Sequence, residues 1–123
     1  SNFDTGKRVS EKAQPERFYH GFVLGLMVDL HLDYVITSNR ESGFGRYDVM
    51  IKPKDVTKNR AFILEFKVHD SEDEETLMDT VQAALKQIEE KQYEAELLAS
   101  GVPKENIRKY GFAFDGKKVL IGE

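Results

Sequence analysis

The segment from residue 61 to residue 68 places two charged side chains inside an apolar run, and this most constrains the fold. It reads AFILEFKV. In a β-strand, residues two apart point to the same face of the sheet. Glu65 and Lys67 are therefore expected to project together, while the apolar residues at 62, 64, 66 and 68 project to the other side. A carboxylate and an ammonium side by side on a mostly buried strand predict a polar site, and a metal site for phosphodiester chemistry is one explanation.

The bulk composition is that of a single globular domain. The chain has 123 residues, of which 40% are hydrophobic and 33% are charged, and a chain of this size can bury one core. Residues 1–13 are polar and carry no clear period, so we expect a loose lead-in followed by one domain over residues 14–123. Because the chain begins with Ser1 rather than Met, we expect it to be one domain of a longer protein.

Several classes of protein are excluded or disfavoured. The chain has no Cys, which excludes disulfides and thiolate zinc sites and is compatible with a reducing compartment. No apolar run approaches the roughly 18–20 residues of a membrane span, and the first residues are polar, unlike a secretory leader. We therefore expect a cytoplasmic protein with no membrane partner. The net charge of −4 argues against nucleic-acid binding by bulk electrostatics alone.

Hydrophobic periodicity predicts the order α-β-β-β-α-β-β. A first helix of about 17 residues starts near Pro15, and Gly21 and Gly25 are expected to allow close packing. Strands follow at residues 34–37, 47–51 and 60–68, the last two joined as a hairpin. Ser71 and Glu74 resemble a capping box for a second helix that runs to residue 99. Two short strands at residues 110–114 and 117–121 surround an Asp-Gly turn.

Asp48 and Glu65 are the candidate metal ligands. Asp48 lies on the second predicted strand and Glu65 on the third, so pairing of these strands would bring both carboxylates to one face. Two carboxylates, with carbonyl and water oxygens, suit Mg²⁺, which can polarise a phosphate and activate a water nucleophile. Lys67 could orient that water or neutralise charge that develops on the phosphate.

Further polar residues are candidates for accessory roles, each with a structural alternative. Gln87 borders the apolar stripe of the second helix and can reach back toward the sheet, or it is simply a polar residue on the helix flank. Glu16 and His20 form an i, i+4 pair that could lean over the same edge, or a helix-surface pair. Glu41 and Arg46 flank a glycine-rich turn and either touch substrate or form a salt bridge.

This pattern resembles the PD-(D/E)XK nuclease superfamily, and more narrowly the subgroup found as the C-terminal domain of AAA-ATPase-like bacterial proteins. The resemblance extends over about residues 15–121. One departure is that Tyr47, not Pro, precedes Asp48. The matching segments are Glu16 with Tyr19-His20-Gly21, Glu41 with Gly45-Arg46-Tyr47-Asp48, Glu65-Phe66-Lys67, Gln87-Ile88 with Lys91 and Tyr93, and Gly111-Phe112-Ala113-Phe114.

The resemblance implies an α/β fold with a restriction-endonuclease-like αβββαβ core, in which helices flank a mixed central sheet. It implies that Asp48 and Glu65 bind Mg²⁺ or Mn²⁺, that Lys67 assists catalysis and that Gln87 positions the site. The accessory positions that it implies are Glu16, His20, Glu41 and Tyr93. The implied function is divalent-metal-dependent hydrolysis of phosphodiester bonds, with DNA favoured over RNA. A catalytically inactive domain that binds nucleic acid, or docks to an N-terminal AAA-ATPase domain, is the alternative.

Overall fold

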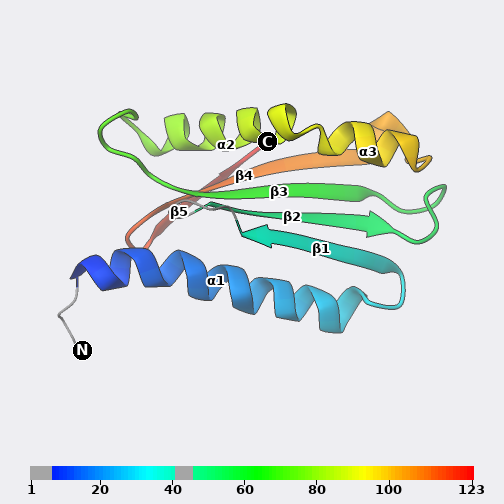
Figure 1. The fold of residues 1–123 in the computed structure, drawn as a ribbon, viewed down its shortest axis with the longest axis horizontal. Coiled ribbons are helices and arrows are strands. Elements are labelled where there is room, and N and C mark those ends of the chain that lie inside the picture. The colour runs from blue at the N-terminus through cyan, green and yellow to red at the C-terminus, as the bar shows by residue number, and fades with distance from the viewer. Residues whose placement is uncertain (1–6, 41–45) are drawn as a thin grey trace.

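The computed structural model describes residues 7–40 and 46–123, and side chains from residue 16 onward within those ranges. No helix in this part of the chain is long and apolar enough to cross a membrane. The described elements, shown in Figure 1, are α1 (Lys7–Leu30), β1 (Tyr34–Arg40), β2 (Arg46–Pro53), β3 (Ala61–Val68), α2 (Leu77–Lys91), α3 (Tyr93–Ala99), the short 3-10 helix η2 (Lys104–Asn106), β4 (Ile107–Asp115) and β5 (Lys118–Gly122).

The five strands form one mixed sheet in the order β1-β2-β3-β4-β5. β1, β2 and β3 make an antiparallel meander, β4 runs parallel to β3, and β5 is antiparallel to β4. A parallel pair needs a long crossover connection, which α2 and α3 supply. The predicted α/β class, the β2–β3 hairpin and the mixed sheet between helices are confirmed, and the element order is consistent with a restriction-endonuclease-like core.

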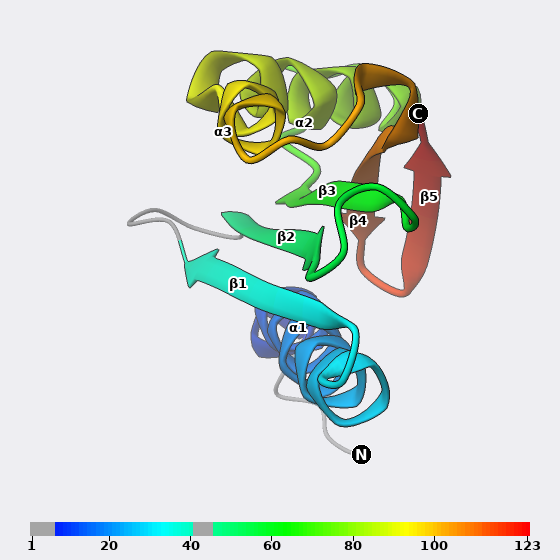
Figure 2. The ribbon, with the colours of Figure 1, turned by 90° about the vertical axis from the view of Figure 1, so that its right-hand side faces the viewer.

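Helices cover both faces of the sheet. α1 lies against one face, and α2 and α3 lie against the other (Figures 1 and 2). On the α1 side, the fully buried Phe66 ring lies 4.7 Å from the ring of Phe112 and 5.7 Å from that of Tyr19. On the α2 side, Ile63 and Ile88 belong to a second apolar cluster. Because strand side chains alternate, the charged residues of β2 and β3 face α2.

The helix α1 is longer than the sequence pattern predicts. It begins at Lys7 and has 24 residues, so Pro15 lies inside it and residues 7–13 are helical. Residues 11–14 read EKAQ, and these residue types are strong helix formers. The first turns of the helix are polar, however, so they lack the hydrophobic periodicity from which a helix start is predicted. The division of the chain at residue 13 stays a prediction. The expectation of close packing at Gly21 and Gly25 is wrong, because a Cβ at either position would meet no atom within 4 Å.

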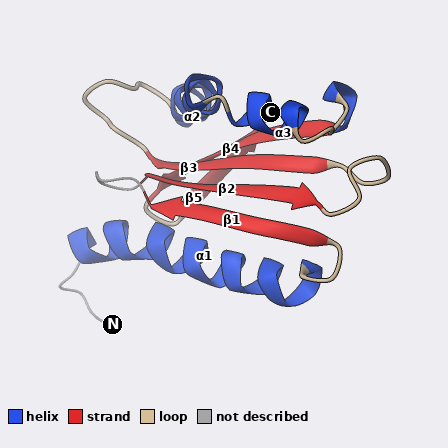
Figure 3. Ribbon diagram, turned by 45° about the vertical axis from the view of Figure 1, so that its right-hand side comes forward, coloured by secondary structure: helices blue, strands red, loops and turns tan. Residues whose placement is uncertain are grey.

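A capping box at Thr76 and Asp79 sets the start of α2. The Thr76 hydroxyl accepts a hydrogen bond from the Asp79 N–H at 3.2 Å, and the Asp79 carboxylate accepts one from the Thr76 N–H at 3.0 Å. The predicted box at Ser71 and Glu74 is wrong, because the Glu74 carboxylate binds other groups. The predicted single helix is also wrong: Gln92 takes a left-handed conformation with φ 59°, which separates α2 from α3 (Figure 3).

The helix α2 lies close to β4 at Gly111. A Cβ at this position would lie 2.9 Å from the carbonyl oxygen of Val81 and 3.2 Å from the Cβ of Ala84. Glycine therefore permits an approach of helix to strand that a larger residue would prevent. Gly111 is also the β4 partner of Glu65, so this close approach brings α2 over the strand that carries Glu65.

Candidate active site

Asp48 and Glu65 form a buried carboxylate pair on adjacent strands. They are direct partners in the antiparallel register of β2 and β3, so both side chains leave the sheet on the α2 side, as the sequence pattern predicts. Asp48 is 1% exposed and Glu65 is 0% exposed. Two carboxylates placed opposite each other and out of water are costly to bury, and a neighbouring positive charge lowers that cost.

Lys91, the last residue of α2, supplies a positive charge to the pair. Its Nζ lies 2.7 Å from Asp48 Oδ2 and 3.4 Å from Glu65 Oε1. The Lys91 side chain is 15% exposed, so this ion pair is largely shielded from water. Because one ammonium contacts both carboxylates, the Oδ2 and Oε1 atoms lie within reach of a single cation.

Neutral donors hold the second oxygen of Asp48. The Asn39 side-chain amide and the Tyr93 hydroxyl each donate a hydrogen bond to Asp48 Oδ1 at 3.1 Å. Asn39 is the β1 partner of Asp48, and Tyr93 begins α3. Burial, the negative charge of Asp48 and this hydrogen bond raise the pKa of Tyr93 above its ordinary value of 10.0. The Tyr93 hydroxyl therefore stays protonated and remains a donor at neutral pH.

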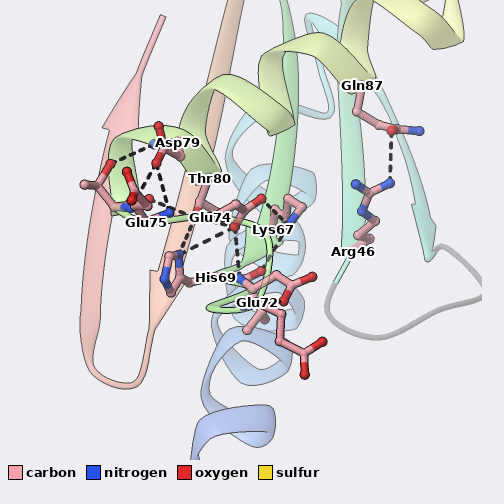
Figure 4. Close-up of polar contacts among 12 residues, drawn as sticks. Arg46, Lys67, His69, Glu72, Glu74, Glu75, Asp79, Thr80 and Gln87 are labelled. Atoms are coloured by element: carbon pink, nitrogen blue, oxygen red, sulfur yellow. Dashed lines mark hydrogen bonds and ion pairs between the residues drawn. The ribbon is translucent and has the colours of Figure 1, made fainter.

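Lys67 projects from the same face of β3 as Glu65 but binds a different carboxylate. Its Nζ donates to Glu74 Oε2 at 2.7 Å (Figure 4). The side chains of Lys67 and Glu74 are 11% and 9% exposed, respectively, so this ion pair is also shielded from water. The predicted shared face of Glu65 and Lys67 is present, and the Lys67 ammonium is engaged by Glu74.

Several donors hold Glu74 in place on the segment before α2. Its Oε1 accepts hydrogen bonds from the Asp70 N–H at 2.9 Å and the Thr80 hydroxyl at 2.7 Å. His69 Nδ1 lies 2.7 Å from the same Thr80 hydroxyl oxygen (Figure 4). Burial alone would raise the pKa of Glu74, but hydrogen bonds from Lys67, the Asp70 backbone and Thr80 outweigh it and leave the pKa below 4.5. Glu74 is therefore ionised at neutral pH.

Arg46 and Gln87 link β2 to α2. The Gln87 Oε1 accepts a hydrogen bond from Arg46 Nη1 at 2.9 Å (Figure 4). Arg46 is the strand partner of Lys67 and precedes Asp48 by two residues, so all three face α2. Gln87 reaches back toward the sheet as predicted, and its contact there is Arg46.

The predicted accessory residues of α1 lie on the other side of the sheet. Glu16 Oε1 accepts hydrogen bonds from Arg40 at 3.1 Å and from the Tyr47 hydroxyl at 3.3 Å. Tyr47 belongs to the α1-side core, and neighbouring strand residues point to opposite faces. The structure therefore does not bring Glu16 to the carboxylate pair. His20 is exposed on α1, and Glu41 lies outside the described residues.

Three residues that contact the site residues are assigned no role at the site from the sequence: Lys91, Asn39 and Glu74. Two of them could have been identified from sequence spacing and strand pairing. Asn39 lies opposite Asp48 once the β1–β2 register is known, and Lys91 follows Gln87 by four residues, on the same side of the helix. Glu74 could not, because its contact depends on how the segment before α2 folds back over β3.

The carboxylate pair fits a hard divalent cation that takes few protein ligands. Among residues 16–40 and 46–123, no group of three or more His, Cys, Asp or Glu side chains could hold a metal ion. Mg²⁺ is commonly bound by one or two carboxylates and completed by water and substrate phosphate oxygens. Asp48 and Glu65 suit a site of this kind.

Comparison with protein families gives a match over most of the chain. A family model described as the PD-(D/E)XK nuclease superfamily matches residues 14–123. The matched segment contains Asp48, Glu65, Lys67 and Lys91. Nucleases of this superfamily generally use divalent metal ions. Comparison with curated proteins and comparison with solved structures gave no match.

Proposed function

Because the chain belongs to the PD-(D/E)XK nuclease superfamily, we propose that it is a divalent-metal-dependent nuclease domain that hydrolyses phosphodiester bonds in nucleic acid. The observation that carries the proposal is the Asp48–Glu65 pair, two buried carboxylates on neighbouring strands within reach of one cation. Burying two carboxyl groups on one face costs folding free energy. A fold that keeps them there is explained by a reaction that needs them.

In this proposal Asp48 and Glu65 hold Mg²⁺ or Mn²⁺. A bound divalent ion supplies polarisation of the phosphate and an activated water at neutral pH. Asn39 and Tyr93 donate hydrogen bonds to the same oxygen of Asp48, which restrains the carboxylate and leaves its other oxygen toward Glu65 and the cation position.

The basic residues on the α2 side of the sheet are assigned to the phosphate. Lys67 neutralises negative charge that develops on the phosphate during attack. Arg46 presents a planar guanidinium, which matches phosphate oxygens in two-point contact, and Gln87 restrains it. The family resemblance favours DNA over RNA as the substrate, and the assay below tests both.

A cleavage assay tests the proposal. Labelled single-stranded and double-stranded DNA and RNA are incubated with the protein in Mg²⁺ or Mn²⁺, with EDTA as the metal-free control. Asp48→Asn and Glu65→Gln are expected to abolish cleavage, and Lys67→Met to slow it by about 10²–10³-fold. As a control, Glu72→Gln also removes one negative charge, but from an exposed loop residue, and this variant is expected to cleave at the wild-type rate. Equal cleavage by wild type and Asp48→Asn would identify a contaminant and refute the proposal.

One observation favours a second candidate function. Both lysines near the carboxylates are in ion pairs, Lys91 with Asp48 and Glu65, and Lys67 with Glu74. A nuclease-fold domain without activity, which binds nucleic acid or docks to an AAA-ATPase domain, would keep such pairs permanently. Mn²⁺ titration separates the two functions. A wild-type protein that binds no Mn²⁺, and whose melting temperature is the same with and without Mn²⁺, favours the inactive domain.

A further inference from the structure

The ammonium of Lys91 lies where a cation shared by the two carboxylates would bind. Its Nζ contacts Asp48 Oδ2 at 2.7 Å and Glu65 Oε1 at 3.4 Å. The side chains of the two acids are 2% and 1% exposed, so solvent contributes little to their neutralisation. A positive charge in contact with both acids is thus built into the chain, at the end of α2.

The hydrogen bonds of Asp48 limit where a second cation could bind. Each carboxylate oxygen accepts about two hydrogen bonds, and Oδ1 already accepts from Asn39 and Tyr93. The oxygen that remains for a metal is Oδ2, which faces Lys91. A Mg²⁺ ion binds oxygens at about 2.1 Å, closer than Nζ lies to either oxygen. A metal at Asp48 Oδ2 and the Lys91 ammonium would therefore meet at one oxygen and repel each other across a short distance.

We propose that Lys91 is the resident counter-cation of the Asp48–Glu65 pair, and that a divalent metal binds by displacing its ammonium. This inference rests on the proposed nuclease function. It adds that Lys91 regulates metal binding, because the metal must break the ion pairs of Lys91 before it binds. The metal-free protein is stabilised by Lys91, and metal affinity is reduced by the same interaction.

Metal binding by the intact protein and by variants tests the displacement directly. MnCl₂ is titrated by calorimetry into wild type, Lys91→Met and Asp48→Asn. Loss of a hydrogen-bonded buried ion pair corresponds to a tenfold change or more in an equilibrium constant. Lys91→Met is therefore expected to bind Mn²⁺ at least about tenfold more tightly than wild type, and Asp48→Asn is expected to lose binding.

A matched control comes from another lysine that bridges two carboxylates. Lys109 Nζ lies 2.7 Å from both Glu89 and Glu94, joining β4 to α2 and α3. Lys109→Met removes a similar ion pair in a part of the fold without the Asp48–Glu65 pair. Its Mn²⁺ affinity is expected to equal that of wild type.

A second measurement uses only the wild-type protein, so its result does not depend on whether a variant folds correctly. Acetylation of lysines by an amine-reactive ester is followed by mass spectrometry with and without Mn²⁺. Displacement is expected to increase the labelling rate of Lys91, which is 15% exposed in the ion pair, and to leave that of Lys109 unchanged.

The outcomes separate this inference from the proposed function. Equal Mn²⁺ affinity for wild type and Lys91→Met, with binding lost in Asp48→Asn, would overturn displacement and leave the metal site standing. Weaker binding by Lys91→Met, or unchanged labelling of Lys91 on saturation with Mn²⁺, would also overturn it. Absence of Mn²⁺ binding by both wild type and Lys91→Met would overturn the inference and the metal-dependent function together.

Discussion

The Lys67–Glu74 ion pair makes a quantitative prediction about stability and its dependence on pH. Glu74→Gln keeps the shape of the side chain and removes its charge. The Lys67 side chain, which is 11% exposed, would then hold its ammonium against a neutral amide. Hydrogen bonds to charged groups contribute about 1.5–3 kcal/mol each, so we expect the free energy of unfolding at neutral pH to fall by about 2–3 kcal/mol.

The pH dependence follows from the lowered pKa of Glu74. A carboxylate whose pKa is lower in the folded state than in the unfolded state stabilises the fold above its unfolded pKa, and the effect is lost as pH falls through the folded value. The pKa of Glu74 lies below 4.5 in the folded protein. The difference between wild type and Glu74→Gln is therefore expected to be constant above about pH 5.5 and to shrink below about pH 4.5.

Urea unfolding at several pH values, followed by circular dichroism, measures both effects. Glu72→Gln is the matched control, since it removes the same charge from an exposed position and should change stability by less than about 0.5 kcal/mol. A double-mutant cycle with Lys67→Met is expected to give a coupling of about 1–3 kcal/mol between Lys67 and Glu74. Additive effects of the two variants, or a Glu74→Gln cost that does not change with pH, would refute the reasoning.

Three further predictions concern the site and the packing that supports it. Tyr93→Phe removes one donor to Asp48 and should lower the free energy of unfolding by about 0.5–1.5 kcal/mol, with slower metal-dependent cleavage; an unchanged rate would contradict a positioning role. Gly111→Ala forces a Cβ against the backbone of α2 and should destabilise the protein by about 1–3 kcal/mol. Gly21→Ala, where a Cβ meets no neighbouring atom, should stabilise it by about 0.5–1 kcal/mol. Thermal denaturation of both variants shows whether the melting temperature falls for the first and rises for the second. Phe66→Ala empties the centre of the aromatic core and should cost about 3–5 kcal/mol in urea unfolding, and a cost below about 1 kcal/mol would show that this core is not well packed.

Much of the fold could be predicted because strand and helix periods are local. The β2–β3 hairpin and the shared face of Asp48 and Glu65 follow from alternation and strand pairing. The helix boundaries could not be predicted in the same way. The break at Gln92 depends on one left-handed residue, and the start of α1 lies in a polar stretch without an apolar period.

The sequence by itself determined which side chains share a face, because the strand period depends only on neighbouring residues. Only the tertiary structure decided which cation meets which carboxylate. Lys91 contacts Asp48, which lies 43 residues earlier in the sequence, and Glu65, which lies 26 residues earlier. Both contacts form because Gly111 lets α2 pack closely over β4. Lys67 instead pairs with a carboxylate from the segment that folds back before α2. Ion-pair partners depend on the relative placement of distant elements, which local periodicity does not encode.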